Sequence, residues 1–494
     1  MSECLLELKG IYKSFGGVKA LQDIYLQVFA GEVLCLAGEN GCGKSTLIKI
    51  ISGFYRPDQG SIFLNGKEHA QMQLREAIRE GIQIVYQDFS VFPNLTVYEN
   101  IAVNTMVVNR RKIVRRKEMM TIAGQALEKL GADIPLHAIV EDLSVANKQL
   151  VAIARAILNN AKIIVFDEPT SALTGKEVKE LFKVIRSLKE QGISILFVSH
   201  KLDEMFDICD RISILSNGKN VIDGPISDFD KKKLVYYMTG KEYQEKSLAG
   251  KVQSSSPLLE VENLGLEGYF KNISFQVYPG EVLGITGLLG SGRTELAKAI
   301  YGLLPADTGT IRIEGKEITV RSAAQGLANH ISYVPEDRLT EALFMEQSIT
   351  GNIVLQSIKK VSQNGMFQKP EAGKQAAHWV ERLHIKTQEP ENPVSTLSGG
   401  NQQKVVLARN LMSNPKLLIL NCPTVGVDIG SKMEISLLIQ QVAKEGMAVI
   451  LISDDPDEIL TNCRRFLMMK NGKIQQEYKS SDYTDSTLYA ELIR

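Results

Sequence analysis

The sequence predicts an α/β fold that occurs twice along the chain. The first observation is an apolar, strand-like run, Val33–Ala37, that passes through a glycine-rich turn into an apolar helical pattern starting near Leu47. The second is that this strand, turn and helix return later, where Gly287 lies 249 positions after Gly38. The third is a polar segment at 241–257 that has the composition of an exposed linker. Together they indicate two copies of one domain.

The repeat defines the domain boundaries. We expect a first domain at 1–240, the linker at 241–257 and a second domain at 258–494. Four further segments recur in the same order, at offsets that grow from 249 to 254 residues between Gln87 and Ser144. A surface loop can absorb that gain, so the repeat is interpreted as a duplicated domain.

The composition is that of an ordinary globular protein. Of the 494 residues, 44% are hydrophobic and 23% charged, and Lys+Arg and Asp+Glu are both 57. Bulk charge therefore predicts neither a nucleic-acid nor a membrane-surface partner. No apolar run approaches the ~18–20 residues that span a bilayer, and the acidic N-terminal segment does not resemble a signal peptide. The six cysteines form no Cys-x-x-Cys pair, which favours a reducing cytosol and mostly buried thiols.

Two strands are expected before the glycine-rich turn, at 5–8 and 24–28, from their apolar and β-branched side chains. Phe15 lies in a short, glycine-flanked segment between them. Its ring can stack on the face of an adenine. The alternative is an aromatic side chain at the edge of the core.

The glycine-rich turn has the features of a P-loop, which surrounds the phosphates of a nucleotide. Its glycines let backbone N–H groups close around phosphate oxygens, and the helix N-terminus adds partial positive charge. Lys44 can reach the β- and γ-phosphates, and the Ser45 hydroxyl can bind Mg²⁺. The alternative is a tight turn that binds nothing. We expect ATP and Mg²⁺ to bind at Gly38, Glu39, Asn40, Gly41, Cys42, Gly43, Lys44, Ser45 and Thr46.

The next strand, 82–86, ends at Gln87, whose side chain can contact Mg²⁺ or an attacking water. Residues 88–142 then differ from the strand segments before them and include a helical region. A basic run within 110–117 could contact nucleic acid or lipid headgroups. Because the chain is neutral overall, we interpret this run as a solvated face.

Two carboxylates and a histidine follow apolar strands in the last part of the first domain. The run 163–166 leads into Asp167 and Glu168, which indicates a buried parallel strand with acids at its carboxyl end, where ligands bind in open α/β sheets. Asp167 can hold Mg²⁺ through water, and Glu168 can polarise an attacking water. His200 directly follows a further strand, 193–199. A lone histidine is usually structural, but this position favours contact with a γ-phosphate.

Together these segments resemble the ATPase subunit of an ABC transporter, over nearly the whole chain. The motifs are Walker A at 38–46, the Q-loop at Gln87, Walker B at 163–168, the D-loop at 171–174, the switch histidine at His200 and the ABC signature at 397–405. The resemblance implies two tandem P-loop domains, each with a RecA-like core, an antiparallel β subdomain and a helical subdomain. It also implies ATP hydrolysis, with Glu168, His200 and Gln87 as catalytic residues and Ser45, Gln87 and Asp167 around Mg²⁺.

Two motif variants restrict the resemblance to one group within this family. Leu-Ser-Gly-Gly-Asn-Gln-Gln-Lys at 397–404 and Val-Pro-Glu-Asp-Arg at 334–338 are similar to the importers of monosaccharides such as ribose, galactose and xylose. Relatives that import autoinducer-2 or nucleosides share these forms. The resemblance implies two membrane permease subunits, an external solute-binding protein, no nucleic acid, and a place on the cytoplasmic face of the cell membrane. The rival hypotheses are a soluble twin ATPase that acts on ribosomes or DNA, and a regulatory pseudo-ATPase.

The domains of that family pair head to tail, so that each nucleotide lies between Walker A of one half and the signature of the other. In this chain one such site would join the first P-loop, Asp167, Glu168 and His200 with Ser398, Gly399, Gly400 and Asn401. The other would contain the departures from the motifs, which are Arg293, Glu336, Asn421, Cys422, Asp454 and the altered signature at 144–147. We therefore expect one catalytic and one degenerate site.

Two further expectations concern the first domain. The segment 88–104 and its repeat after Glu336 are expected to dock the permeases, and the apolar contacts in the first copy would come from Phe89, Phe92, Leu95 and Tyr98. The alternative is that these side chains belong to the core of a helical subdomain. Cys42 lies within the P-loop, so modification of its thiol is expected to block ATP.

Overall fold

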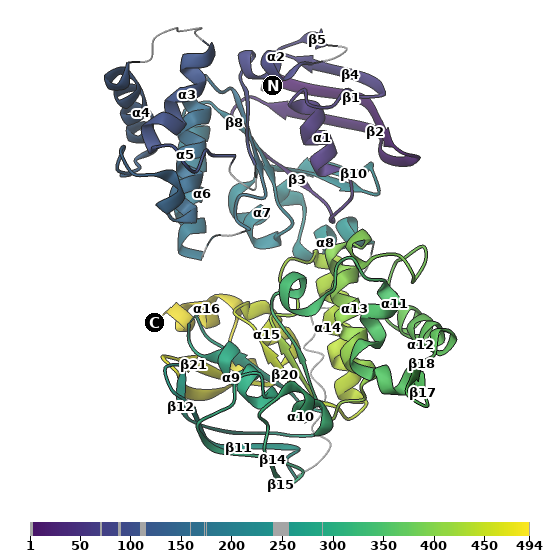
Figure 1. Cartoon of the computed structure of the whole chain (residues 1–494). Helices are drawn as coiled ribbons and strands as arrows, with labels where there is room; N and C mark the ends of the chain where they lie inside the picture. Colours follow the sequence, from purple (N-terminus) through teal and green to yellow (C-terminus); the bar gives the residue numbers. More distant parts are fainter. Residues whose placement is uncertain are drawn as a thin grey trace. The chain divides into compact units, whose positions relative to one another are not determined.

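Figure 1 shows the computed structural model of the chain. It describes residues 3–69, 72–86, 90–108, 115–158, 160–171, 173, 175–240, 256–288 and 290–493. Contacts within the chain divide it into two compact units, unit 1 (Met1–Tyr243) and unit 2 (Gln244–Arg494). The segment 241–255, which covers most of the expected linker, lies outside the described residues.

Unit 1 contains an antiparallel sheet with the strand order β2-β1-β4-β5. Its two long strands form a tight hairpin in which Phe15 pairs with Val18. Both strands are longer than the predicted 5–8 and 24–28, because register shifts along the pair interrupt the alternation that marks a strand in a sequence. The strands are β1 (Cys4–Phe15), β2 (Val18–Phe29), β4 (Gln59–Leu64) and β5 (Lys67–His69).

The second sheet of unit 1 has the order β10-β9-β3-β8-β7-β6. The pairs among β9, β3, β8, β7 and β6 are parallel and β10 is antiparallel to β9, so the carboxyl ends of β3, β7 and β8 meet at one edge. These three strands are continuous apolar runs because helices cover both faces of such a sheet. The strands are β3 (Val33–Ala37), β6 (Ile82–Val85), β7 (Ile163–Asp167), β8 (Ser194–Val198), β9 (Arg211–Ser216) and β10 (Lys219–Pro225).

The helices of unit 1 fall into two groups. Those numbered α3, α4 and α5 enclose a separate apolar cluster that includes Tyr98, Ile101 and Leu127, and they form the helical subdomain. The others accompany the sheets (Figure 1). The helices are α1 (Lys44–Ile51), α2 (Leu74–Arg79), α3 (Val97–Val108), α4 (Arg116–Leu130), η1 (Val140–Asp142), α5 (Val145–Leu158), α6 (Gly175–Glu190), α7 (Leu202–Ile208), η2 (Ile226–Asp228) and α8 (Lys231–Thr239).

Unit 2 repeats both sheets. Their orders are β12-β11-β14-β15 and β16-β19-β20-β13-β21-β22, and a small hairpin, β17-β18, is added. The first hairpin is shorter than in unit 1, with strands of 8 residues each in place of 12. The strands are β11 (Leu259–Leu266), β12 (Phe270–Val277), β13 (Val282–Thr286), β14 (Thr308–Ile313), β15 (Lys316–Ile318), β16 (Ile331–Val334), β17 (Ser362–Gln363), β18 (Met366–Phe367), β19 (Leu417–Asn421), β20 (Ala448–Ile452), β21 (Arg465–Lys470) and β22 (Lys473–Lys479).

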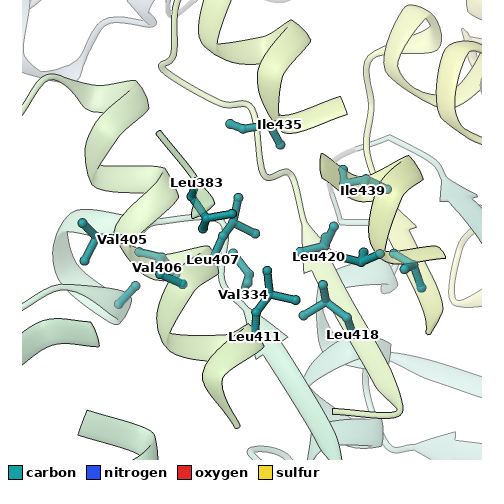
Figure 2. Packing of buried hydrophobic residues seen from close by; sticks show 14 of the residues in the cluster. Val334, Leu383, Val405, Val406, Leu407, Leu411, Leu418, Leu420, Ile435 and Ile439 are labelled. Carbon is teal, nitrogen blue, oxygen red and sulfur yellow. The ribbon is translucent and has the colours of Figure 1, made fainter. Parts of the chain in front are cut away.

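The core of unit 2 connects its helical subdomain to the large sheet. Figure 2 shows Leu407 and Leu411 of α13 beside Val334 of β16 and Leu418 of β19. The helices are α9 (Arg293–Tyr301), α10 (Ala323–Ala328), η3 (Arg338–Ala342), α11 (Ile349–Val354), η4 (Leu355–Val361), α12 (Lys369–Arg382), η5 (Val394–Thr396), α13 (Gly399–Met412), α14 (Ile429–Lys444), α15 (Pro456–Asn462), η6 (Ser480–Asp482) and α16 (Asp485–Ile493).

The predicted fold class is confirmed. Each unit has an α/β core sheet, an antiparallel β sheet and a helical subdomain. Among the described residues, every helix is too short or too polar to cross a membrane.

Candidate nucleotide sites

The P-loop of unit 1 connects the buried strand β3 to α1. Gly43 caps α1 with a φ of 110°, in the left-handed region, and a Cβ there would lie 2.7 Å from the Ala20 carbonyl oxygen. Lys44 is buried, and its Nζ donates hydrogen bonds to the carbonyl oxygens of Gly38 (2.7 Å) and Glu39 (2.9 Å). The ammonium group therefore lies over the loop, where a P-loop binds phosphate.

The two predicted catalytic side chains at the carboxyl edge of the sheet lie together. Glu168 directly follows β7 with a left-handed φ of 49°, and its N–H donates to the Val198 carbonyl oxygen of β8 at 3.1 Å. His200 Nδ1 lies 3.2 Å from Glu168 Oε1. The hydrogen bond that this carboxylate accepts lowers the pKa of Glu168, so the group stays ionised at neutral pH. The arrangement suits a general base held in one orientation by a histidine.

Asp167 and Ser45 supply oxygen ligands of the kind that Mg²⁺ prefers. Burial raises the pKa of Asp167, the neighbouring Glu168 charge raises it further, and the Lys44 ammonium opposes both. A divalent cation at this position would favour the ionised carboxylate. Ser45 is exposed at the start of α1. The donor set therefore fits the expected ion.

Other predicted residues of the first site are less completely described. Phe15 is the last residue of β1 and 40% exposed, with its ring centroid 5.1 Å from that of Tyr55. It is therefore neither in an open loop nor in the core, and adenine stacking stays a prediction. Gln87 lies outside the described residues, as do Ala172 and Thr174 of the D-loop.

The basic side chain of the P-loop in unit 2, Arg293, has different partners from Lys44 in unit 1. Arg293 is buried, and its Nη1 donates to the Gly287 carbonyl oxygen. Its Nη2 lies 3.4 Å from Asp454 Oδ2, which forms an ion pair. Asp454 occupies the position that corresponds to His200, so the residue at that position pairs with a carboxylate in unit 1 and with the P-loop cation in unit 2.

The positions of the two carboxylates also differ in unit 2. Asn421 is fully buried at the end of β19 and donates to Thr294 Oγ1 at 3.3 Å and to the Tyr333 hydroxyl at 3.5 Å. Thr294 corresponds to Ser45, so the two positions expected around Mg²⁺ bond directly to each other. Cys422 is buried with a φ of 47°, and burial raises the pKa of its thiol. Neither side chain supplies a carboxylate.

The signature of unit 2 forms a short hydrogen-bond chain at the start of α13. Ser398 Oγ accepts a hydrogen bond from Asn401 Nδ2 at 2.9 Å, and Asn401 Oδ1 accepts one from the Lys386 N–H at 2.9 Å. Gly400 is buried, and a Cβ there would lie 1.9 Å from Ser431 Oγ. Packing against Ser431 within unit 2 therefore favours glycine at 400.

One of the residues expected to dock a permease is part of the core instead. Tyr98 is only 2% exposed, and its hydroxyl accepts a hydrogen bond from Arg116 Nε at 2.7 Å. For Tyr98 the structure supports the alternative, a side chain in the core of the helical subdomain, because its position on α3 faces the apolar cluster. Leu95 is partly buried, and Phe89 lies outside the described residues.

Phe92 fits the docking prediction better. It is 49% exposed, and Phe344, its counterpart in unit 2, is 58% exposed. The same device holds each loop, because Asn100 bonds both the N–H and the carbonyl oxygen of Phe92, and Asn352 does the same for Phe344. Two exposed aromatic side chains, each on a loop whose backbone is fixed by an asparagine, are therefore available for contacts.

Sequence reasoning did not identify the partnership of Arg293 and Asp454. In the sequence, the two substitutions stand only as separate departures from the motifs. The signal was present, because a longer cation and a new anion appear together at positions that both face the γ-phosphate in an intact site. Only the folded sheet brings them within 3.4 Å.

Modification of Cys42 is expected to be slow and to increase with pH. Its side chain is 5% exposed, and burial raises the pKa of the thiol above the ordinary value. Because the thiolate is the nucleophile, less of it is present at pH 7 than for an exposed cysteine. Iodoacetamide should label Cys4, which is partly exposed, before Cys42, and loss of ATP hydrolysis should follow labelling of Cys42. Mass spectrometry checks the order, Cys42→Ala is the control, and normal hydrolysis by fully Cys42-labelled chains would contradict the prediction.

Comparison with known proteins agrees with this geometry. A family model described as ABC transporter matches residues 21–171 and 270–425. The chain therefore belongs to the ABC transporter family, as an ATPase with two tandem domains.

Its relatives define the group more narrowly. The chain is 39% identical over 485 residues to the ribose import ATP-binding protein RbsA of Geobacillus kaustophilus, with 98% of both chains covered. It is 39% identical to that of Caldanaerobacter subterraneus, with 99% of both covered, and 36% identical to that of Bacillus subtilis, with 98% of both covered. It is thus an ATP-binding protein of the monosaccharide-importer type.

Proposed function

We propose that this chain drives the import of ribose or a related monosaccharide by hydrolysing ATP at one composite site. The site would combine the P-loop, Asp167, Glu168 and His200 of unit 1 with 398–401 of unit 2. The observation that carries the proposal is the contrast between the units. Unit 1 has an ionised Glu168 bonded to His200, whereas unit 2 has the buried Cys422 at the same position.

The residues of unit 1 act in sequence. Lys44 exchanges its loop carbonyl partners for the β- and γ-phosphates. Asp167 and Ser45 would hold Mg²⁺, which when bound neutralises charge on the phosphate oxygens. Glu168 accepts a proton from the water that attacks the γ-phosphate, while His200 keeps the carboxylate in place and ionised.

The degenerate site is proposed not to hydrolyse ATP and to accompany the catalytic site. Arg293 is already bonded to Gly287 and Asp454, and Asn421 to Thr294. Independent drift would have damaged both composite sites, yet the departures at the second P-loop and at 144–147 fall on one of them. This distribution supports head-to-tail pairing of the two domains, as the family resemblance implies.

The cycle requires partners that this chain does not contain. We propose that Phe92 and Phe344 contact two membrane permease subunits, that a solute-binding protein delivers the sugar, and that the chain lies on the cytoplasmic face of the membrane. ATP bound between the domains would close them, and hydrolysis would reopen them. The closed and open arrangements are then two states whose balance depends on contacts with the γ-phosphate. Autoinducer-2 and nucleosides remain the alternative solutes.

Uptake of labelled solutes by cells tests the proposal. A host that lacks its own copy would carry either the wild-type chain or Glu168→Gln, together with the permease. Ribose, galactose and xylose are supplied separately, with autoinducer-2 and a nucleoside as comparison solutes. We expect uptake of one monosaccharide to depend on Glu168. Dependence for a comparison solute alone would overturn the sugar assignment, and uptake of all solutes independent of Glu168 would overturn the importer assignment.

A further inference from the structure

Arg338 of unit 2 lies against the signature and connects it to another loop. Its Nη1 donates to the Val425 carbonyl oxygen at 2.7 Å, and its Nη2 donates to the Gly426 carbonyl oxygen at 3.0 Å. These two carbonyls belong to the loop that corresponds to the D-loop of unit 1. Arg338 is thus bonded to that loop through both of its terminal nitrogens.

The same guanidinium touches the signature glycine. A Cβ on Gly399 would lie 2.7 Å from Arg338 Nη2 and 3.0 Å from the Gly426 carbonyl oxygen. Gly426 itself has a left-handed φ of 67°. Arg338, Gly399 and Gly426 therefore pack closely, and a Cβ on Gly399 would displace the guanidinium and crowd the Gly426 carbonyl oxygen. Gly399 directly follows Ser398, so the position of the guanidinium bears on the signature.

The local backbone holds Arg338 in this position. It is the first residue of η3, and Asp337 caps that turn. Asp337 Oδ1 accepts hydrogen bonds from the N–H groups of Leu339 (2.9 Å) and Thr340 (3.2 Å), and Oδ2 accepts one from Thr340 Oγ1 at 2.6 Å. The planar guanidinium can then reach two carbonyls at once, which a lysine ammonium would not match.

The arginine accompanies the intact signature and is missing from the altered one. The repeat offset of 249 holds as far as Asp88 and Asp337, and the residues of unit 1 that follow, 89–95, contain no arginine or lysine. Unit 1 is also the unit whose signature has Val145 and Ala146 in place of the two glycines. A cation that served only to stabilise this region of the fold would be equally useful in both units.

We propose that Arg338 is a positioning residue that fixes the signature loop for ATP hydrolysis. It would hold Gly399 against Gly426 so that the Ser398 hydroxyl and the N–H groups at the start of α13 stay aimed at the γ-phosphate. The inference rests on the proposed function, in which the signature of unit 2 completes the site of unit 1. Arg338 also begins the segment that leads to Phe344, so it joins the proposed docking loop to the signature.

The kinetics of Arg338→Ala and Arg338→Lys in the full chain test this role. We expect kcat for ATP hydrolysis to fall by ~10–100-fold in Arg338→Ala, because small displacements of a positioning group have effects of this size. KM for ATP should change by less than about threefold, since Lys44 and the P-loop still bind the nucleotide. Arg338→Lys should restore only part of the rate. Arg312→Ala, which removes a partly exposed arginine from the antiparallel sheet, is the matched control and should behave as wild type.

Three outcomes separate the possible explanations. A kcat within twofold of wild type in Arg338→Ala or in Arg338→Lys, while Glu168→Gln and Ser398→Ala are inactive, would overturn the role of Arg338 alone. Retained activity in Glu168→Gln would overturn the proposed function itself. A lowered melting temperature with unchanged kcat in the folded fraction would assign Arg338 a purely structural role, and Arg338→Lys supplies the same readout if Arg338→Ala does not fold.

Discussion

Replacing Glu168 by Gln is expected to lower ATP hydrolysis by ~10²–10⁴-fold, which is the range for removing a general base. Glutamine keeps the shape and the hydrogen-bonding capacity of the side chain but does not accept the proton of an attacking water. Binding of ATP should be retained, because the P-loop and Lys44 are unchanged. Phosphate release under saturating ATP measures the first effect, and equilibrium binding of a fluorescent ATP analogue measures the second.

Cys422→Ala is the matched control for this experiment. Cys422 directly follows β19 with the same left-handed backbone as Glu168 after β7, and it is buried with a pKa raised by burial. It therefore has no base to lose, and we expect phosphate release within twofold of wild type. Unchanged hydrolysis in Glu168→Gln, or a large loss in Cys422→Ala, would show that the chemistry has been assigned to the wrong unit.

The sequence predicted those features that depend on neighbours along the chain. The P-loop, the apolar strand that leads to Asp167 and Glu168, and the glycine signature at the start of α13 are each continuous segments, so residue type and spacing were sufficient. Because the domain is duplicated, the motifs of the two copies could be compared, and this comparison distinguishes the intact set from the altered set.

The features that the sequence did not predict are contacts between distant segments. Arg293 with Asp454, Asn421 with Thr294, and Arg338 with the carbonyls of 425–426 all join positions that only the folded sheet brings together. The sequence left two alternatives open for Tyr98, docking and the core, for a similar reason, because its burial depends on the packing of α3 against α4 and α5. The length of β1 and β2 was underestimated because register shifts along the pair interrupt their alternation.

The central claim is that the catalytic site draws its signature from unit 2, and a matched pair of substitutions tests it. Ser398 and Ser144 occupy the same position in the two signatures, each followed by a helix, α13 and α5. If Ser398 completes the site of Lys44 and Glu168, Ser398→Ala removes a hydroxyl that contacts the γ-phosphate, and Ser144→Ala alters only the degenerate site. Removing one such donor costs ~10²–10³-fold in kcat in comparable sites.

The measurement is the steady-state rate of phosphate release by both purified variants, beside wild type and with the permease present. Our account predicts a loss of ~10²-fold or more in Ser398→Ala and a rate within about threefold of wild type in Ser144→Ala. Equal losses in the two variants, or a larger loss in Ser144→Ala, would contradict the pairing of Ser398 with Lys44 and Glu168, and with it the proposal of a single catalytic site.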